Sequence, residues 1–85
     1  MPRIRFTEEA NKDFRYWKRH DSTKTRRIEK LCKDATLHPF EGIGKPEPLK
    51  FDLHGCWSRR IDRINRLVYQ VTKKEIVIIS CRYHY

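Results

Sequence analysis

Three side chains of this sequence could together cleave an RNA phosphodiester. In that reaction the 2′-hydroxyl attacks its own phosphate, so a site needs a base for the hydroxyl proton, a cation for the charge of the phosphorane and an acid for the departing 5′-oxygen. Glu47, Arg66 and His84 are of the types that fill these roles, in that order. The chemistry requires no metal, and the sequence has no plausible metal-ligand spacing, so we expect no metal ion and no cofactor.

The loop that carries Glu47 should hold it rigidly. Pro46 and Pro48 flank Glu47 and fix φ on either side of it, and Pro48 also favours an extended conformation of Glu47 itself. The carboxylate is therefore held at low entropic cost, in a loop of a kind that often carries function. A surface turn with one solvated glutamate is the alternative explanation of the same pattern.

Arg66 and His84 should lie at the start of one strand and at the end of the next. The strand expected over residues 66–71 has apolar side chains at alternate positions, Leu67, Tyr69 and Val71. Arg66 therefore belongs to the opposite face. Residues 76–79 are all β-branched, which is typical of a buried strand, and His84 follows them. In an antiparallel meander such strand ends can converge. The alternative for His84 is a strand end that simply meets water.

The register between these two strands decides whether Arg66 and His84 can act together. A two-residue loop at Lys73-Lys74 would pair Arg66 with Cys81 and place His84 on the reverse face of the sheet. A three-residue loop or a β-bulge would place Arg66 and His84 on one face. The catalytic interpretation therefore predicts an odd loop or a bulge between the strands.

The remaining elements should support this sheet from one side. Residues 3–6 alternate as a short strand, and Thr7 is expected to cap a helix that runs to about Arg19. Asp21 or Ser22 should cap a second helix, which His38-Pro39 ends. We predict an α+β fold with an N-terminal strand, two helices and then a curved antiparallel sheet. A single domain over residues 1–85 accounts for this length.

Composition favours a polyanionic partner. The 85 residues include 20 Lys and Arg against 11 Asp and Glu, a formal charge of +9. We expect nucleic acid first and an acidic protein second. The three cysteines are odd in number and contain no C-x-x-C pair, so neither a disulfide framework nor a zinc site follows. With no leader and no membrane span in the sequence, we expect a cytoplasmic protein with reduced, buried thiols and no membrane contact.

Four segments in order resemble the Txe/YoeB family of bacterial toxins, within the RelE superfamily. They are Gly44-Lys45-Pro46-Glu47-Pro48-Leu49-Lys50, Gly55-Cys56-Trp57-Ser58-Arg59-Arg60-Ile61, Asn65-Arg66-Leu67-Val68-Tyr69 and Arg82-Tyr83-His84-Tyr85. The similarity spans nearly the whole chain and is most specific after His38. It implies a RelE-like fold and the toxin of a type II toxin–antitoxin pair, an endoribonuclease that enters the ribosomal A site, cuts the messenger there and so inhibits translation.

The resemblance also implies roles for single residues. Glu47 would be the general base, Arg66 the cation of the transition state and His84 the general acid, with Tyr85 helping to orient the site. Lys50 and Arg60 match family positions that contact the RNA backbone, and Arg59 is a looser candidate for such a contact.

The same resemblance implies two protein partners. One is a cognate antitoxin of the YefM/Axe type, whose C-terminal segment would cover the basic surface, and the other is a second copy of the toxin in a homodimer. The clearest departure from the family pattern is Arg63-Ile64-Asn65, where relatives often carry acidic residues.

Two other functions are compatible with the sequence. A basic module could bind RNA or the ribosome and block translation without cutting, but it would not need Glu47. A relative on the same fold could inhibit a protein such as a topoisomerase, but it would have no use for Tyr83-His84-Tyr85. Substitution of Glu47 and of His84 separates these functions from cleavage.

Overall fold

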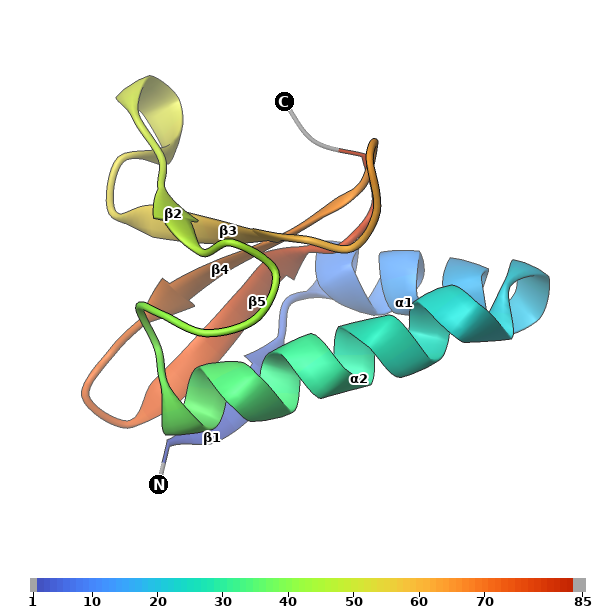
Figure 1. Ribbon diagram of the computed structural model, residues 1–85, viewed down its shortest axis with the longest axis horizontal. Coiled ribbons are helices and arrows are strands. Elements are labelled where there is room, and N and C mark those ends of the chain that lie inside the picture. The colour runs from blue at the N-terminus through green and yellow to red at the C-terminus, as the bar shows by residue number, and fades with distance from the viewer. Residues whose placement is uncertain (1, 84–85) are drawn as a thin grey trace.

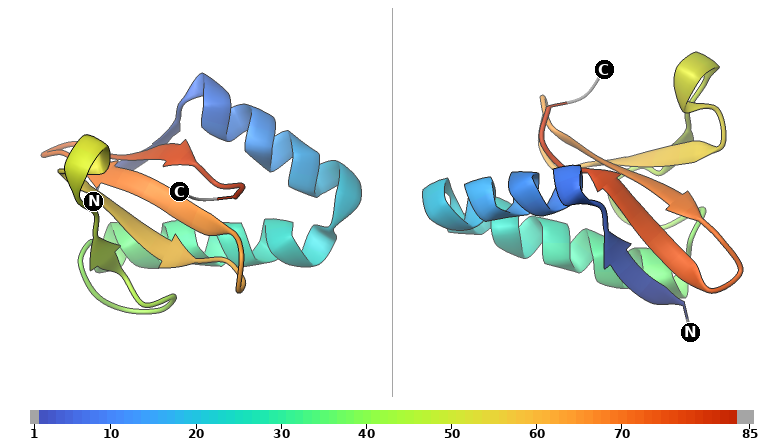
Figure 2. Two further views of the ribbon diagram at one scale, coloured as in Figure 1. Left: turned by 90° about the horizontal axis from the view of Figure 1, so that it is seen from above. Right: turned by 180° about the vertical axis from the view of Figure 1, so that it is seen from behind.

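A five-stranded sheet with both helices on one face makes up the structure, a computed structural model that describes residues 2–83. The elements are β1 (Arg3–Phe6), α1 (Glu8–His20), α2 (Ser22–Leu37), β2 (Glu47–Pro48), the 3-10 helix η1 (Phe51–Leu53), β3 (Cys56–Arg60), β4 (Arg66–Val71) and β5 (Glu75–Ser80). Figure 1 shows the helices below the sheet and η1 on the opposite side, while Cys81, just after β5, contacts Trp17 of α1. Within the described residues, neither α-helix covers the second face of the sheet, which we call the open face (Figure 2).

The predicted helix caps are confirmed. The hydroxyl of Thr7 accepts a hydrogen bond from the Ala10 N–H at 3.1 Å and begins α1. Asp21 lies between the two helices. Its carboxylate accepts a hydrogen bond from the Thr23 N–H at 3.0 Å and so caps α2. Helix α2 ends at Leu37, before Pro39. Neither helix, nor any other among the described residues, has the length and apolar character needed to cross a bilayer.

The sheet has the order β1-β5-β4-β3-β2 and is mixed. Strands β3, β4 and β5 form the predicted antiparallel meander. Strand β1 runs parallel to β5, with Arg3 opposite Glu75 and Phe6 opposite Ile78. The two-residue strand β2 adds to the far edge, where Glu47 lies opposite Ser58.

A β-bulge lies between β4 and β5, as the catalytic interpretation predicts. The loop is the tight one, with the Thr72 N–H donating to the Glu75 carbonyl at 2.9 Å. Tyr69 pairs with Ile78, but Val68 pairs with Ser80, so Ile79 is the extra residue. The bulge shifts every later residue by one position relative to β4. His84 itself lies outside the described residues.

The core lies between the sheet and the helices. The fully buried side chains of its sheet side are Leu67, Tyr69, Ile76 and Ile78, and those of its helix side are Ala10, Ile28, Leu31 and Ala35. Trp17 joins the layers, because its indole N–H donates to the Cys81 carbonyl at 2.8 Å. Cys32 and Cys81 are buried free thiols, as predicted, and burial raises the pKa of Cys32 to about 12. Cys56 is only half-buried.

Candidate active site on the open face of the sheet

Glu47 and Arg66 meet on the open face. Residues directly opposite in an antiparallel pair share a face, and Glu47 lies opposite Ser58 while Arg66 lies opposite Arg60. Ser58 and Arg60 are two residues apart, so all four side chains belong to the same face. Arg66 Nη1 lies 2.9 Å from Glu47 Oε1 in an ion pair that bridges β3. The side chain of Glu47 is 55% exposed and that of Arg66 is 25% exposed, so both can reach a ligand.

Arg59 shapes the loop that leads to Glu47. The side chain is fully buried and faces the helices, and its Nη1 lies 2.6 Å from Asp34 Oδ2 in α2. The guanidinium also donates to three carbonyls of the loop, those of His38, Glu41 and Ile43. The hydrogen bond from Arg59 holds the pKa of Asp34 below its usual range. The loop over residues 38–43 is therefore held in place by hydrogen bonds from the buried Arg59 guanidinium.

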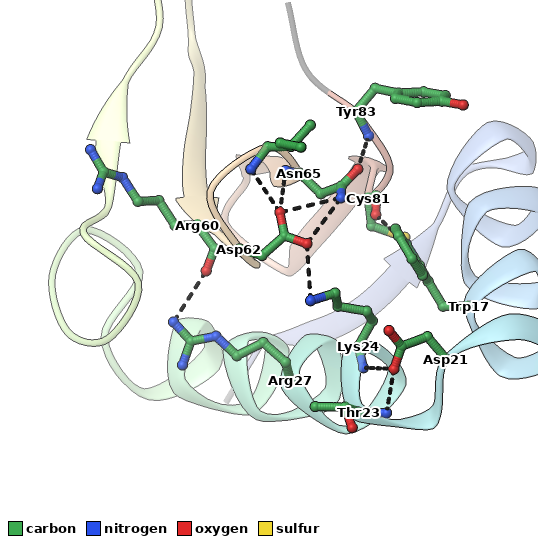
Figure 3. A network of polar contacts seen from close by, with 11 residues as sticks. Trp17, Asp21, Thr23, Lys24, Arg27, Arg60, Asp62, Asn65, Cys81 and Tyr83 are labelled. Atoms are coloured by element: carbon green, nitrogen blue, oxygen red, sulfur yellow. Dashed lines mark hydrogen bonds and ion pairs between the residues drawn. The ribbon is translucent and has the colours of Figure 1, made fainter.

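The prediction that Arg59 contacts RNA is wrong. Every nitrogen of its guanidinium donates within the protein, including Nε to the Tyr69 hydroxyl at 3.0 Å, and no part of the side chain reaches the surface. Arg60 and Lys50 are exposed, so both remain candidates for contacts with RNA. In Figure 3 Arg27 of α2 donates to the carbonyl of Arg60 at 3.1 Å, which fixes the end of β3 while the Arg60 side chain stays at the surface.

The turn into β2 depends on left-handed backbone at two consecutive residues. Gly44 has φ +82° and Lys45 has φ +51°. The Gly44 carbonyl accepts from the Arg60 N–H at 2.7 Å, which sets the end of the loop against β3. A Cβ at residue 44 would lie 2.7 Å from the Leu31 side chain, so this approach requires glycine. The sharp turn delivers Glu47 to the open face.

Asn65 holds the segment that leads to residues 84 and 85. Its side-chain oxygen accepts from the Tyr83 N–H at 2.6 Å, and the adjacent Arg66 N–H donates to the Tyr83 carbonyl at 3.0 Å. Its side-chain nitrogen donates to both oxygens of Asp62, which is also paired with Lys24 Nζ at 3.1 Å (Figure 3). Burial of the Asp62 carboxyl raises its pKa. Hydrogen bonds from Asn65 and Ile64 have the larger, opposite effect, so the pKa of Asp62 lies well below its usual range.

The sequence analysis did not assign a role to Asp62 or Asn65. A signal was present, because an aspartate that starts a short polar turn commonly accepts hydrogen bonds from the next backbone N–H groups. Asp62 does so from the N–H groups of Ile64 and Asn65. The departure from the family pattern at Arg63-Ile64-Asn65 therefore falls on a well-ordered turn, with Arg63 and Ile64 exposed.

Of the residues predicted to carry the chemistry, the structure brings Glu47 and Arg66 together. His84 and Tyr85 lie outside the described residues. The last described residue is Tyr83, whose backbone is fixed at both its N–H and its carbonyl against the start of β4.

Known proteins resemble this chain along its length. Residues 6–85 match the family model described as the YoeB-like toxin of the bacterial type II toxin–antitoxin system. Toxin YoeB of Streptomyces coelicolor is 51% identical over 83 residues, which are 98% of this chain and 99% of the relative. A YoeB dimer from Staphylococcus aureus has a TM-score of 0.92 at 42% identity, covering 99% of this chain and 98% of the other. A YoeB–YefM complex from the same organism has a TM-score of 0.90 at 41% identity, covering 100% and 99%.

Proposed function

This chain belongs to the YoeB-like toxins of bacterial type II toxin–antitoxin systems, and we propose that it is an endoribonuclease that cleaves messenger RNA in the ribosomal A site. The observation that supports this proposal most directly is the ion pair of Glu47 and Arg66 at 2.9 Å on the open face of the sheet. This exposed pair lies next to the C-terminal segment and outside the core, and it supplies two of the three groups that RNA cleavage requires, the base and the cation.

The proposed reaction is an attack of the 2′-oxygen on the adjacent phosphorus. Glu47 takes the proton of the 2′-hydroxyl, the new O–P bond forms and the bond from phosphorus to the 5′-oxygen breaks. Arg66 stabilises the negative charge of the phosphorane, and His84 gives a proton to the departing 5′-oxygen. The products are a 2′,3′-cyclic phosphate and a free 5′-hydroxyl. All of these roles belong to side chains, and Tyr85 would help to orient them.

The ion pair gives Arg66 a second task in the proposed mechanism. In the free protein its guanidinium donates to Oε1, one of the two carboxylate oxygens of Glu47. A phosphate placed near Arg66 competes for the same guanidinium, and this releases the carboxylate to act as a base. Lys50 and Arg60, both exposed, would hold the flanking phosphates.

The proposed partners follow from the family. Relatives from Staphylococcus aureus form a YoeB dimer and a YoeB–YefM complex. We expect this toxin to bind a cognate antitoxin of the YefM/Axe type, to be able to form a homodimer, and to act in the cytoplasm, where translation takes place. The antitoxin would neutralise it by covering the basic surface around the site.

Messenger cleavage during translation tests the proposal. The purified protein is added to a translation reaction with and without ribosomes, and new 5′ ends of the messenger are mapped by primer extension. We expect cuts inside the A-site codon that depend on ribosomes. Substitution of Glu47→Gln or His84→Gln should lower the rate by about 10²- to 10⁴-fold, because each removes one proton-transfer group.

Glu41→Gln is the matched control for Glu47→Gln. Glu41 is an exposed carboxylate of the same loop, and its side chain makes no ion pair with residues 2–83, so the variant has the same change of charge and should cleave at the parent rate. Halted translation with an intact messenger would instead indicate a toxin that blocks the ribosome without cutting, and the cleavage mechanism would be abandoned.

A further inference from the structure

A second cationic surface lies beside α1, apart from Glu47 and Arg66. It is a groove of about 290 Å³ between the C-terminal half of α1 and the segment after β5. We call it the α1 groove, and its lining residues are Lys12, Arg15, Tyr16, Arg19, His20 and Arg82. The cations Lys12, Arg15 and Arg19 are spaced by three and four residues, so they lie on one side of the helix.

Three cations of the α1 groove are exposed and unpaired with carboxylates. They are Lys12, Arg15 and Arg19, and no ion pair joins any of them to a carboxylate within residues 2–83. Arg19 lies favourably in the last turn of α1, but like charges one turn apart weaken a helix. A polyanion bound in the groove would relieve this repulsion.

Aromatic rings alternate with these cations. The Arg82 guanidinium lies 3.5 Å from the centre of the Tyr16 ring, and the His20 ring lies 4.3 Å from it on α1. Arg82 also donates to the Tyr83 hydroxyl at 2.8 Å, and Tyr83 is 59% exposed. Arg82 covers the half-buried Tyr16 ring, so the exposed rings are those of His20 and Tyr83. Exposed rings beside positive charges suit single-stranded RNA, whose phosphates contact the cations while its bases stack. An acidic peptide would require the charges alone.

Two consecutive residues, Arg82 and Tyr83, connect the α1 groove with the candidate active site. The Tyr83 carbonyl accepts from the Arg66 N–H at 3.0 Å, and Arg82, which lines the groove, precedes Tyr83 in the chain. We propose that the α1 groove binds phosphates of an RNA backbone beyond the cleaved codon. This inference rests on the proposed function in that RNA is the substrate. The phosphates belong either to the messenger or to ribosomal RNA.

Binding of an RNA that cannot be cut tests the groove without altering the catalytic residues. A 2′-O-methyl oligonucleotide lacks the attacking hydroxyl, and its affinity is measured by fluorescence anisotropy over a series of salt concentrations. The variant Lys12→Gln/Arg15→Gln/Arg19→Gln should bind at least about tenfold more weakly. The slope of log affinity against log salt should also fall by about 0.7 for each phosphate that the variant no longer neutralises.

The matched control removes the same charge from the other helix. Arg26, Lys30 and Lys33 of α2 are exposed and form no ion pair within residues 2–83, so Arg26→Gln/Lys30→Gln/Lys33→Gln has an equal net charge. This variant should keep the parent slope. Equal decreases in affinity for the two triple variants would mean that net charge alone matters, and the groove would be rejected.

Co-sedimentation with ribosomes that carry no messenger identifies the source of the phosphates. Weaker binding seen only with the oligonucleotide assigns the groove to the messenger, and weaker binding seen only with ribosomes assigns it to ribosomal RNA; either supports the proposal. If the Lys12→Gln/Arg15→Gln/Arg19→Gln variant binds like the parent in both assays, the proposal is overturned. This holds even if the variant binds the antitoxin more weakly. These assays measure no cleavage, so they can succeed even if Glu47→Gln shows that the proposed chemistry is wrong, and the reverse also holds.

Discussion

At the scale of single residues, Asn65 uses both the oxygen and the nitrogen of its side-chain amide. It uses an acceptor for the Tyr83 N–H and a donor for the Asp62 carboxylate at the same time. An aspartate would lose the donor and place a second negative charge beside Asp62, and an alanine would lose both bonds. Asn65 therefore acts as a positioning residue for the segment that leads to the proposed general acid.

Substitution of Asn65→Ala should reduce cleavage more than it reduces stability. We expect the single-turnover cleavage rate at saturating ribosomes to fall about tenfold or more, because a small misplacement of a catalytic group is costly. Removal of the hydrogen bonds should lower the free energy of unfolding by about 1–3 kcal/mol, measured in urea. The apparent affinity for ribosomes should stay within about twofold, since no RNA contact is removed.

Ile64→Ala serves as the control in the same turn, because the Ile64 side chain is 63% exposed. It should cleave at nearly the parent rate. The positioning role is refuted if Asn65→Ala cleaves as fast as the parent at a temperature where both are folded, or if its defect appears only as weaker ribosome binding.

At the scale of elements, the sequence predicted most of what positions the site. Alternation and capping residues were sufficient for β1, both helices and the meander, because these signals are local. An odd loop or a bulge between β4 and β5 was also predicted, from the requirement that Arg66 and His84 act together, and the structure has the bulge, at Ile79. The parallel pairing of β1 with β5 was not, since a pattern within one strand does not identify its neighbour.

The burial of Arg59 shows where prediction from the sequence failed. Trp57 in β3 and Ile61 just after it are apolar, and strand alternation places Arg59 between them on the same face. The family resemblance instead led to the prediction that Arg59 contacts RNA, and arginine side chains are mostly exposed in proteins. The partner that makes burial feasible, Asp34, lies 25 residues earlier in α2, and no local pattern connects the two.

Substitution of Arg59→Lys should destabilise the loop before β2 despite the retained charge. A lysine cannot donate to several carbonyls and to Asp34 in one plane, so buried acceptors would be left unpaired. We expect the free energy of unfolding to fall by about 2 kcal/mol or more in urea titrations. The neighbouring exposed change Arg60→Lys should alter it by less than about 0.5 kcal/mol. Equal effects of the two substitutions would contradict the structural role of Arg59.

At the scale of the whole molecule, two ion pairs within residues 2–83 join α2 to β3 and to the turn that follows it. Asp34 of α2 pairs with Arg59 of β3, and Lys24 of α2 pairs with Asp62 in the turn after β3. The pKa of each carboxyl is lowered in the folded state, by the hydrogen bond from Arg59 for Asp34 and, against the effect of burial, by hydrogen bonds from Asn65 for Asp62. Attachment of the helix layer should therefore weaken in acid.

The sign of this effect can be tested with Asp62→Asn. A carboxyl whose pKa is lower when folded stabilises the protein fully above its unfolded value of about 3.9, and the contribution disappears as the pH falls toward the folded pKa. The difference in unfolding free energy between the parent and Asp62→Asn should be constant from pH 7 to about pH 5 and should shrink below about pH 3.9. Urea titrations at each pH measure it, and a difference that grows in acid would contradict the proposed linkage.

The pairing of β1 with β5 also has a consequence for synthesis. Strand β5 lies between β1 and β4, so it is the link that makes one sheet of all the strands. The Thr7 hydroxyl that begins α1 donates to the Ile79 carbonyl, 72 residues away in the chain. Contacts of such long range form late and slowly. A nascent chain thus carries both helices and four strands before β5, the strand that unites them, has been made, so the complete sheet cannot form until β5 is free of the ribosome.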